Sequence, residues 1–307
     1  MKGKDLLSVA DLTADDIGGL LDHAQEMMGT RGRQLEGKTV ALLFEKPSLR
    51  TRVSFEVAAR HLGGDSLFLS PAEVGLGTRE PASHVARVFS RYVDGLVVRT
   101  FAQGTLEELA QHASIPVING LSNQEHPCQA LADLLTIQQK KRKLAGLTLA
   151  FVGDANNVAR SLLLASAKVG VNFHLATPSA YAMDEDTVSQ ARSAAATSGS
   201  RLLFTRDARE AVTGADVVYT DVWTSMGQEA ESVQRRKDFS AYQVDAGLLS
   251  AAPDAMLMHP LPAHPGEEVA PDILEGPQSV IFDQAENRLH LQKAVLARLM
   301  KGNLSRE

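Results

Sequence analysis

The chain has 307 residues, of which 44% are hydrophobic and 22% charged, and its net charge is −6. These values predict a soluble globular protein with one large domain or two ordinary ones, and they argue against a nucleic-acid partner, an anionic membrane surface and extensive disorder. One cysteine, Cys128, excludes a disulfide framework, and no zinc-ligand spacing occurs. The first residues show no signal-peptide pattern and no apolar run approaches ~20 residues, so we expect a cytoplasmic protein.

Helix-like and strand-like segments alternate along the first half of the chain. An amphipathic helix is predicted over residues 11–28. The next segments are short, almost continuously apolar strands over 39–44, 66–70, 95–100 and 116–119, separated by helices over 50–62, 81–92 and 105–113. Strands covered on both faces have this composition, and the alternation predicts βαβ units in a parallel sheet.

A helix over residues 128–143 ends in the basic run KKRK, which is typical of a solvated helix C-terminus. The alternation then restarts. Strands are predicted over 147–153, 172–176, 201–205, 216–220, 256–260 and 280–282, and helices over 158–169, 184–197, 208–212 and 283–301. The pattern predicts an α/β protein of two domains, 1–143 and 144–307, each a parallel sheet flanked by helices.

Polar residues follow almost every predicted strand. In open parallel sheets, ligands bind beyond the carboxyl ends of the strands. The strand exits read EKPSLRTR, Arg99-Thr100, NGLSNQEHPCQ, GDANN, DVWTSMGQE and HPLPAHPGEE. Six such clusters indicate a ligand site at the carboxyl edge.

The segment SLRTR has the features of a phosphate site. Pro47 suits the start of a helix and Ser48 can cap it. Exposed N–H groups and the helix dipole favour an anion there, and Arg50 and Thr51 add donors. The alternative is a capped helix with two arginines facing solvent. A Walker loop is absent from the sequence.

His126 precedes Pro127, which suits the first position of the next helix. A neutral histidine there could donate to a carbonyl oxygen, and Gln129 could hold an NH₂ group. The alternative is a loop histidine satisfied by the backbone. Cys128 is expected to be a packed thiol, because no base is placed beside it in the sequence.

The strand exit FVGDANN lacks the second and third glycines of a dinucleotide fingerprint. Asn156 and Asn157 are therefore interpreted as polar contacts. Asp221 is a candidate anchor for a substrate amine, with a helix cap or a turn as the alternative. Trp223 is expected to pack beside the site.

Taken together, these motifs resemble those of the ornithine carbamoyltransferases, in the aspartate/ornithine carbamoyltransferase superfamily. The matching stretches are FEKPSLRTRVSFE, VVRT, NQEHPCQALADLLTI, FVGDANN, TDVWTSMGQEAE, HPLPAHPGEEV and DQAENRLH. They cover essentially the whole chain, and SMGQE separates the ornithine branch from the aspartate branch.

The resemblance implies transfer of a carbamoyl group from carbamoyl phosphate to the δ-amine of L-ornithine, giving citrulline and phosphate. It implies a homotrimer or a multiple of trimers, no metal and no organic cofactor. The last helix, about 284–302, is expected to pack back on the first domain. Transfer of the proton to the departing phosphate is expected, because no residue is an obvious dedicated base.

Site residues carry over from the same motifs. The implied carbamoyl phosphate ligands are Ser48, Leu49, Arg50, Thr51, Arg99, His126, Gln129, Arg288 and the backbone of Pro260 and Leu261. The implied catalytic residues, as donors to the developing oxyanion, are Arg50, Thr51, Arg99 and His126. The implied ornithine ligands are Asn157, Asp221, Ser225 and Met226.

The chain departs from the family pattern at four positions. Leu49 replaces a threonine, which removes a hydroxyl and keeps the backbone N–H. Gly75 stands where the family usually has a glutamine that reaches into a neighbouring subunit's site. The resemblance therefore does not predict this contact for the present chain. His84 is the first residue of HVAR, which stands where the family has the motif DTAR. Pro260 replaces the cysteine of HCLP and keeps its carbonyl acceptor.

Three further functions stay open at this point. The chain could carbamoylate a different amine, because Gly75 and Pro260 alter the less certain parts of the site. It could be a non-catalytic relative that binds carbamoyl phosphate or a partner protein. A nucleotide-dependent oxidoreductase is weaker, because the dinucleotide glycines are missing.

Overall fold

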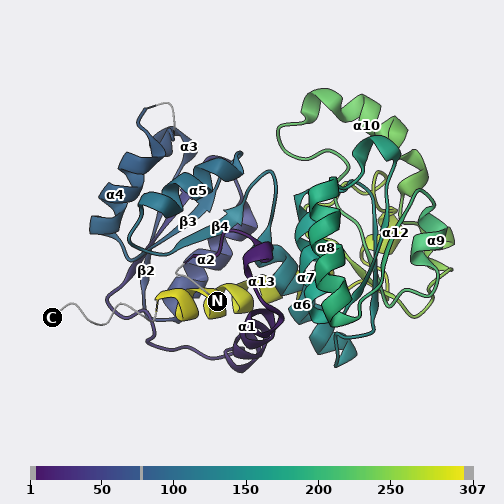
Figure 1. Cartoon of the computed structure of the whole chain (residues 1–307), viewed down its shortest axis with the longest axis horizontal. Helices are drawn as coiled ribbons and strands as arrows, with labels where there is room; N and C mark the ends of the chain where they lie inside the picture. Colours follow the sequence, from purple (N-terminus) through teal and green to yellow (C-terminus); the bar gives the residue numbers. More distant parts are fainter. Residues whose placement is uncertain (1–4, 77–78, 301–307) are drawn as a thin grey trace. The chain divides into compact units, whose positions relative to one another are not determined.

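The computed structural model describes residues 5–76 and 79–300 and forms two compact units. Unit 1 comprises Met1–Leu135 together with Asn287–Glu307, and unit 2 comprises Thr136–Glu286. Each unit contains one parallel sheet with helices around it (Figure 1). The predicted fold class, an α/β protein with two parallel sheets, is therefore confirmed.

The sheet of unit 1 has the strand order β2-β1-β3-β4. Its strands are β1 (Thr39–Phe44), β2 (Asp65–Leu69), β3 (Gly95–Arg99) and β4 (Val117–Leu121). The inner strands β1 and β3 are buried almost throughout. The expectation that all four strands are covered on both faces is wrong for β2, where Leu67 is 51% exposed. As an edge strand, β2 has a neighbouring strand on one side only.

Unit 1 contains the helices α1 (Ala14–Glu26), α2 (Leu49–His61), α3 (Pro71–Val74), α4 (Ala82–Tyr92) and α5 (Gln103–His112). The chain passes between the units within α6 (Pro127–Lys141) and again within α13 (Ile281–Met300). At the start of α2, Ser48 is the N-cap, as its sequence predicts. Pro47 directly precedes the cap, at the start of the helix.

The sheet of unit 2 has the strand order β7-β6-β5-β8-β9, and all of its pairs are parallel. Its strands are β5 (Thr148–Val152), β6 (Asn172–Ala176), β7 (Leu202–Thr205), β8 (Val217–Tyr219) and β9 (Met256–Met258). Its helices are α7 (Asn157–Val169), α8 (Glu185–Ser198), α9 (Ala208–Val212), α10 (Ser232–Asp238), α11 (Ala246–Leu249) and α12 (Pro271–Leu274). The sequence predicted the strands and the helices α7 to α9, and missed the short helices that follow.

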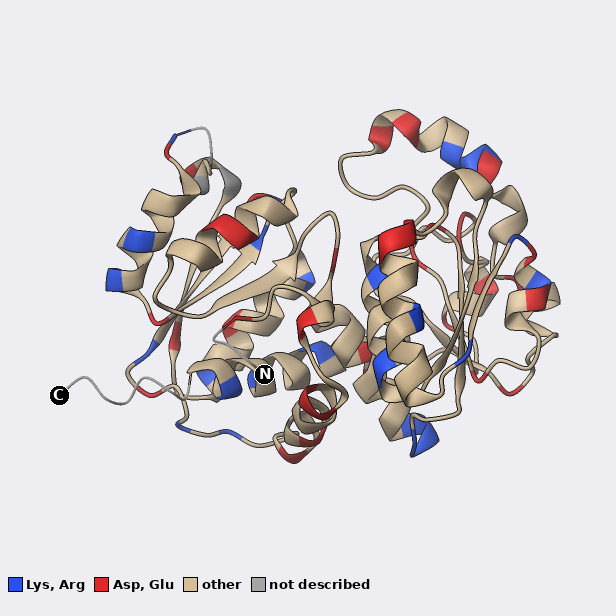
Figure 2. Cartoon of the chain, in the orientation of Figure 1, with Lys and Arg blue, Asp and Glu red and all other residues tan. Residues whose placement is uncertain are grey.

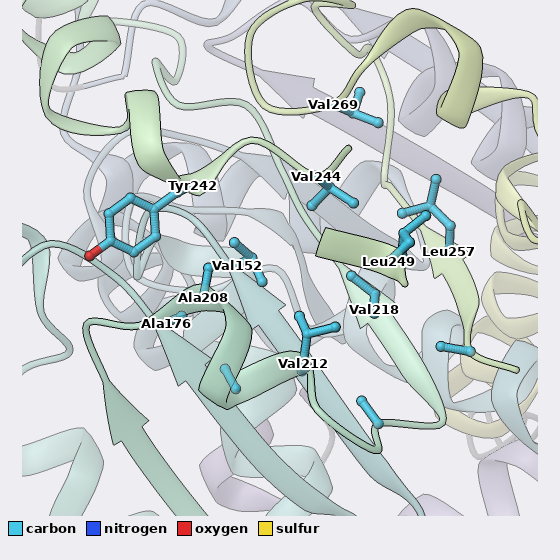
Figure 3. Packing of buried hydrophobic residues seen from close by; sticks show 14 of the residues in the cluster. Val152, Ala176, Ala208, Val212, Val218, Tyr242, Val244, Leu249, Leu257 and Val269 are labelled. Carbon is cyan, nitrogen blue, oxygen red and sulfur yellow. The ribbon is translucent and has the colours of Figure 1, made fainter. Parts of the chain in front are cut away.

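A core cluster of unit 2, made of aliphatic and aromatic residues, lies between the strands and the helices that cover one face. Figure 3 shows Val152 and Val218 from β5 and β8 beside Val212 of α9 and Leu249 of α11. These side chains are 3% exposed or less. Burial of this apolar surface fixes the face of the sheet on which α9 and α11 pack, and the strand exits lie at one edge of that same sheet.

The predicted strand over residues 280–282 is wrong. Helix α13 begins at Ile281, and Phe282 in its first turn is 64% exposed. The pairing that resembles a strand occurs just earlier, where the Val280 N–H donates to the Leu257 carbonyl at 3.0 Å. An apolar triplet is too short to show whether its period is two or 3.6 residues.

Charged residues of both signs occur on each unit, and Figure 2 shows them mainly on helices and loops. The strands carry few of them. None of the helices in the described part of the chain is long and apolar enough to cross a membrane.

Within unit 1, the C-terminal part of α13 is bound to the region around α1. The Lys293 Nζ atom donates to the Met27 carbonyl at 2.7 Å and to the Thr30 carbonyl at 2.6 Å. Lys293 is 1% exposed, so these carbonyls replace the water that its ammonium group loses. Arg298 adds an ion pair with Asp16 at 3.1 Å. The expected helix end near residue 302 lies outside the described residues.

Replacing Lys293 by methionine should lower the free energy of unfolding of unit 1 by about 2–4 kcal/mol, because a buried ammonium group and its hydrogen bonds to the Met27 and Thr30 carbonyls are lost. Urea denaturation followed by far-UV circular dichroism measures this loss. Fluorescence of Trp223 would not report on the unfolding of unit 1, because the only tryptophan of the sequence lies in unit 2.

The matched control is Lys140→Met, which removes an ion pair with Asp283 between side chains that are 40% and 51% exposed. An exposed pair contributes about 0–1 kcal/mol, so this variant should unfold almost like the parent. Equal losses in the two variants would contradict a structural role for the buried ammonium group.

Candidate functional site

The carboxyl ends of β1, β3 and β4 come together in unit 1. Phe44 is paired with Arg99, and Arg99 with Leu121, where the ladder contains a β-bulge at Val98/Arg99. The Glu45 N–H donates to the Arg99 carbonyl at 2.8 Å. Between these pairs β3 advances by one residue and β4 by two, so the extra residue of the bulge is Gly120 of β4.

The segment SLRTR forms the first turn of α2, directly after the exit of β1. The Ser48 hydroxyl accepts the Thr51 N–H at 3.3 Å, which satisfies one of the donors at the helix start. Leu49 is 75% exposed, Arg50 is partly buried and Thr51 is 1% exposed. The hydroxyl group of Thr51 accepts a hydrogen bond from Arg288, which lies on α13.

Three guanidinium groups lie close enough in unit 1 to affect one another. Burial, and after it the cations Arg288 and Arg50, lower the pKa of Arg99 to about 10. Burial also lowers the pKa of Arg50. The Arg99 Nε atom is buried and has no hydrogen-bond partner among the described residues. Like charges gathered in a buried place are unfavourable unless an anion offsets them.

His126 lies immediately before α6, whose first residue is Pro127. Its carbonyl accepts the N–H groups of Gln129 and Ala130, as that of a capping residue does. Burial holds the pKa of His126 well below its usual value, and the nearby cations Arg288 and Arg99 act in the same direction. The imidazole is therefore neutral near pH 7 and carries one N–H donor.

Gln129 and Cys128 lie in the first turn of α6, and only Gln129 has a polar atom available to a ligand. The Gln129 amide nitrogen donates to Asp133 at 2.8 Å, while its buried carbonyl oxygen has no partner among the described residues. That oxygen is an available acceptor for an NH₂ group. Burial raises the pKa of Cys128 to about 12 and its thiol donates to the Asn119 carbonyl at 3.8 Å. A thiol in this state is not a nucleophile.

Glu125 is a structural residue of this edge that the sequence reasoning missed. Its carboxylate accepts the Ser8 hydroxyl and, at 3.0 Å, the Val9 N–H. Both donors come from the N-terminal segment, which thereby holds the loop that carries His126. No local pattern in NQEHPCQ predicts contacts that span more than one hundred residues.

In unit 2, side-chain hydrogen bonds join the exits of β5 and β8. Asn156 caps α7 through its side-chain oxygen, and its amide nitrogen donates to Asp221 at 2.8 Å. Asp221 also accepts the Val222 N–H, so the turn interpretation describes a real contact, and its role as an anchor for a substrate amine stays a prediction. Burial raises the pKa of the Asp221 carboxyl group above its usual value. Asn157 is the first residue of α7 and is partly buried.

The segment TSMGQE follows β8 and forms a turn. The Gln228 side chain accepts the Ser225 N–H at 3.0 Å, and Met226 is 47% exposed. Arg235 of α10, which the sequence reasoning missed, donates to the Trp223 carbonyl at 3.0 Å and to Asp154 at 2.8 Å. These contacts hold the segment against the exit of β5, where burial raises the pKa of Asp154 to about 6.

The HPLP segment follows β9. Pro260 is buried, Leu261 is partly buried, and the Leu261–Pro262 peptide bond is cis. The side chain of His259 is fully buried and contacts Glu268 at 3.0 Å. Among the described residues, His264, Glu267 and Glu268 form one group of potential metal ligands, with one ligand atom of each within 4.8 Å of the others. Glu267 also pairs with Arg236, so this group has protein partners of its own.

The structure thus gathers the predicted residues in two sets. Unit 1 brings together Arg50, Thr51, Arg99, His126 and Arg288 through a hydrogen bond and mutual electrostatic effects. Ser48 and Leu49 precede them at the start of α2, where the Ser48 oxygen already serves as the cap. Unit 2 contains Asn157, Asp221, Ser225, Met226, Pro260 and Leu261 at or after the exits of β5, β8 and β9. The first set suits a small anion and the second offers a carboxylate for a cation.

Comparison with known proteins also divides the chain into two domains, although the family models assign the last helix to the second domain, whereas most of its residues belong to unit 1 in the structure. Residues 4–139 match the family model described as "Aspartate/ornithine carbamoyltransferase, carbamoyl-P binding domain". Residues 145–299 match the model described as "Aspartate/ornithine carbamoyltransferase, Asp/Orn binding domain".

Individual relatives match along almost the whole chain. The anabolic ornithine carbamoyltransferase of Pyrococcus furiosus is 50% identical over 308 residues, covering 98% of both chains. The ornithine carbamoyltransferase of Gloeobacter violaceus is 52% identical over 300 residues, covering 97% of this chain and 96% of that protein.

Solved structures agree with these relatives. The Pyrococcus furiosus ornithine carbamoyltransferase superposes with a TM-score of 0.94 at 50% identity, covering 97% of each chain. The anabolic enzyme of Campylobacter jejuni gives a TM-score of 0.93 at 38% identity, covering 97% of this chain and 99% of that one. The motifs, the fold and these matches lead to one conclusion: the chain belongs to the aspartate/ornithine carbamoyltransferase family.

Proposed function

We propose that the chain transfers the carbamoyl group of carbamoyl phosphate to the δ-amine of L-ornithine, forming L-citrulline and phosphate. The observation that carries the proposal is the gathering of Arg50, Arg99 and Arg288 in unit 1. Carbamoyl phosphate is a dianion, and its charge offsets the mutual repulsion of these cations. The SMGQE motif after β8 and the names of the relatives favour ornithine as the acceptor.

The phosphate group binds at the start of α2. The backbone N–H of Leu49, the Ser48 and Thr51 side chains and the helix dipole supply donors and positive potential there. Arg50 and Arg99 add charge-assisted hydrogen bonds, and Arg288 does so while bonded to Thr51. Because Ser48 already caps the helix, its hydroxyl proton remains as its donor to the ligand.

Attack of the amine on the carbonyl carbon produces a tetrahedral oxyanion. Thr51, Arg99 and His126 are the donors that stabilise it. His126 acts as a neutral donor, because its depressed pKa keeps the imidazole unprotonated near pH 7. The carbamoyl NH₂ group binds the free carbonyl oxygen of Gln129 and the backbone carbonyls of Pro260 and Leu261.

Ornithine binds through the residues at the strand exits of unit 2. Asp221 pairs with the α-ammonium group, and Asn157, Ser225 and Met226 complete the contacts. The δ-amine has a free pKa near that of lysine, ~10.4, so it loses a proton before it attacks. The departing phosphate accepts that proton, and much of the rate comes from holding the two substrates in line.

Further features are part of the same proposal. Unit 1 is the carbamoyl phosphate-binding domain and unit 2 the ornithine-binding domain, and the chain forms a homotrimer or a multiple of trimers. The anabolic direction, and so arginine biosynthesis, is supported by the names of two relatives. A cytoplasmic location stays a prediction.

A second candidate is the same transfer to a different amine. Pro260 and Gly75 favour it, because each replaces a side chain that contacts the substrate region in the family pattern. Gly75 has a φ of 51°, a conformation that glycine adopts readily, so the backbone there also suits the glycine.

An amine panel tests the choice between these candidates. With carbamoyl phosphate present, the purified protein should form citrulline from L-ornithine faster than it carbamoylates putrescine, aspartate or N-acetylornithine. Product formation is followed by mass spectrometry for every amine at matched concentrations. Preference for any of the other three amines would replace the proposed acceptor, while no turnover at all would favour a binding protein.

A pair of arginine variants tests the phosphate site. Arg50→Ala should lower kcat/KM by at least about 10²–10³-fold, the loss typical when one preorganised donor is removed. Arg52→Ala removes the same charge two residues later, where the side chain pairs with Glu56 and lies over Phe68. It should retain activity within about threefold of the parent. Similar losses in both variants would argue against a specific role for Arg50.

Removal of the Asp221 carboxylate tests the amine site. Asp221→Asn should raise the KM for ornithine and leave the KM for carbamoyl phosphate almost unchanged. In the parent, the KM for ornithine should also rise as the pH falls towards the raised pKa of Asp221, because the protonated carboxyl group no longer attracts the ammonium group. The variant should lose that part of the pH dependence.

The control for this variant is Asp207→Asn, since Asp207 caps α9 and asparagine caps equally well. Steady-state kinetics of both variants across pH 5–8 provide the comparison. An unchanged KM for ornithine in Asp221→Asn would place the ammonium group elsewhere.

A further inference from the structure

Leu261 has a backbone conformation that its side chain disfavours. Its φ is 55°, in the left-handed region where non-glycine residues are uncommon. Such residues persist where the surrounding structure determines them, and they cluster at functional sites. In this segment the acceptor that holds the conformation is identifiable, because the Leu261 N–H donates to the His259 Nδ1 atom at 2.9 Å.

This hydrogen bond fixes the tautomer of His259. A backbone N–H is always a donor, so Nδ1 must be the acceptor and the ring proton must lie on Nε2. Nε2 contacts the Glu268 Oε1 atom at 3.0 Å and donates to it. The same oxygen accepts the His264 N–H at 2.6 Å. Glu268 therefore selects the form of His259 that can hold Leu261.

Both side chains of the pair are fully buried, and both are held by the body of unit 2. The His259 N–H donates to Gln284 at 2.8 Å, and Gln284 donates to the Tyr219 hydroxyl at 3.1 Å. The Glu268 carbonyl accepts the Val244 N–H at 2.9 Å. The pair thus connects the HPLP segment to β8 and to the core, rather than to solvent.

We propose that His259 and Glu268 are positioning residues, which fix the Pro260–Leu261 backbone so that its carbonyl groups point at the carbamoyl end of the substrate. The inference rests on the proposed function, in which these carbonyls bind the carbamoyl NH₂ group. In this proposal, two buried side chains set the direction in which the backbone carbonyl groups point. Neither side chain touches the substrate in this arrangement.

Two substitutions at His259 separate the two hydrogen bonds. In His259→Asn, the amide oxygen lies as many bonds from Cα as Nδ1 does, so it can still accept the Leu261 N–H. In His259→Gln, the amide nitrogen lies as many bonds from Cα as Nε2 does, so it can still donate to Glu268 and the Leu261 acceptor is lost. The chain thus allows each contact to be kept without the other.

The expected result is a difference in turnover. His259→Gln should lower kcat/KM by about 10–100-fold, the range seen when a group that orients a ligand-contacting residue is removed. His259→Asn should retain clearly more activity, because Leu261 keeps its partner. Equal losses in the two variants would overturn the proposal, because the Leu261 hydrogen bond would then not control activity.

A control at another histidine separates positioning from stability. His174 of β6 is partly buried, and its Nδ1 atom contacts the Ala211 carbonyl at 2.9 Å. His174→Gln should lower the melting temperature and leave kcat/KM unchanged. If activity in all three variants simply follows the melting temperature, the effect is structural and the positioning role is wrong.

A measurement on the parent protein covers the case in which the His259 variants do not fold. Nitrogen-15 NMR of labelled histidines should show His259 as a neutral ring protonated on Nε2. A ring protonated on Nδ1 would overturn the proposal.

The kinetic comparison of the His259 variants does not depend on which amine is the substrate, because each variant is assayed with whichever amine the parent uses. A parent that prefers another amine contradicts the proposed acceptor, and the ratio between the two His259 variants still decides the positioning role.

Discussion

Electrostatic repulsion among three cations is the constraint on which the candidate site of unit 1 depends. Arg50, Arg99 and Arg288 come from a helix start, a strand end and the last helix, and burial of Arg99 and Arg288 removes most of the water that would screen their charges. Folding alone gains nothing from this arrangement. A bound dianion removes the repulsion, so the same feature that costs stability supplies affinity. The neutral state of His126 follows first from burial, which lowers its pKa, and the cations Arg288 and Arg99 act in the same direction.

The second constraint is the parallel direction of the strands. Neighbouring parallel strands end at the same edge of a sheet. The residues that follow these strands therefore lie close together, although they are far apart in the sequence. In unit 2 this edge brings Asn156 to Asp221 across 65 positions. Side chains behind the edge then hold the loops, as Arg235 does for the Trp223 carbonyl and His259 does for the Leu261 N–H. The loops that carry function are therefore positioned from the core outward.

Local patterns predicted much of the fold because they depend on neighbours in the chain. The buried strand β1 and the helix α7 have bounds within one residue of those expected from apolar runs and periodicity. The errors share a cause. The exposed face of β2 depends on its edge position, and the short segment at 280–282 depends on where α13 begins, and neither is encoded within a few residues.

The sequence by itself determined which residue types follow each strand, the cap at Ser48, the proline that starts α6 and the motifs that mark the family. Those features are local, since they need only the chemistry of adjacent residues. The tertiary structure decided the protonation of His126, the anchoring of Glu125 by the N-terminal segment and the hydrogen bond that fixes Leu261. Burial and long-range contacts control these properties, because desolvation and hydrogen-bond partners exist only once distant segments meet.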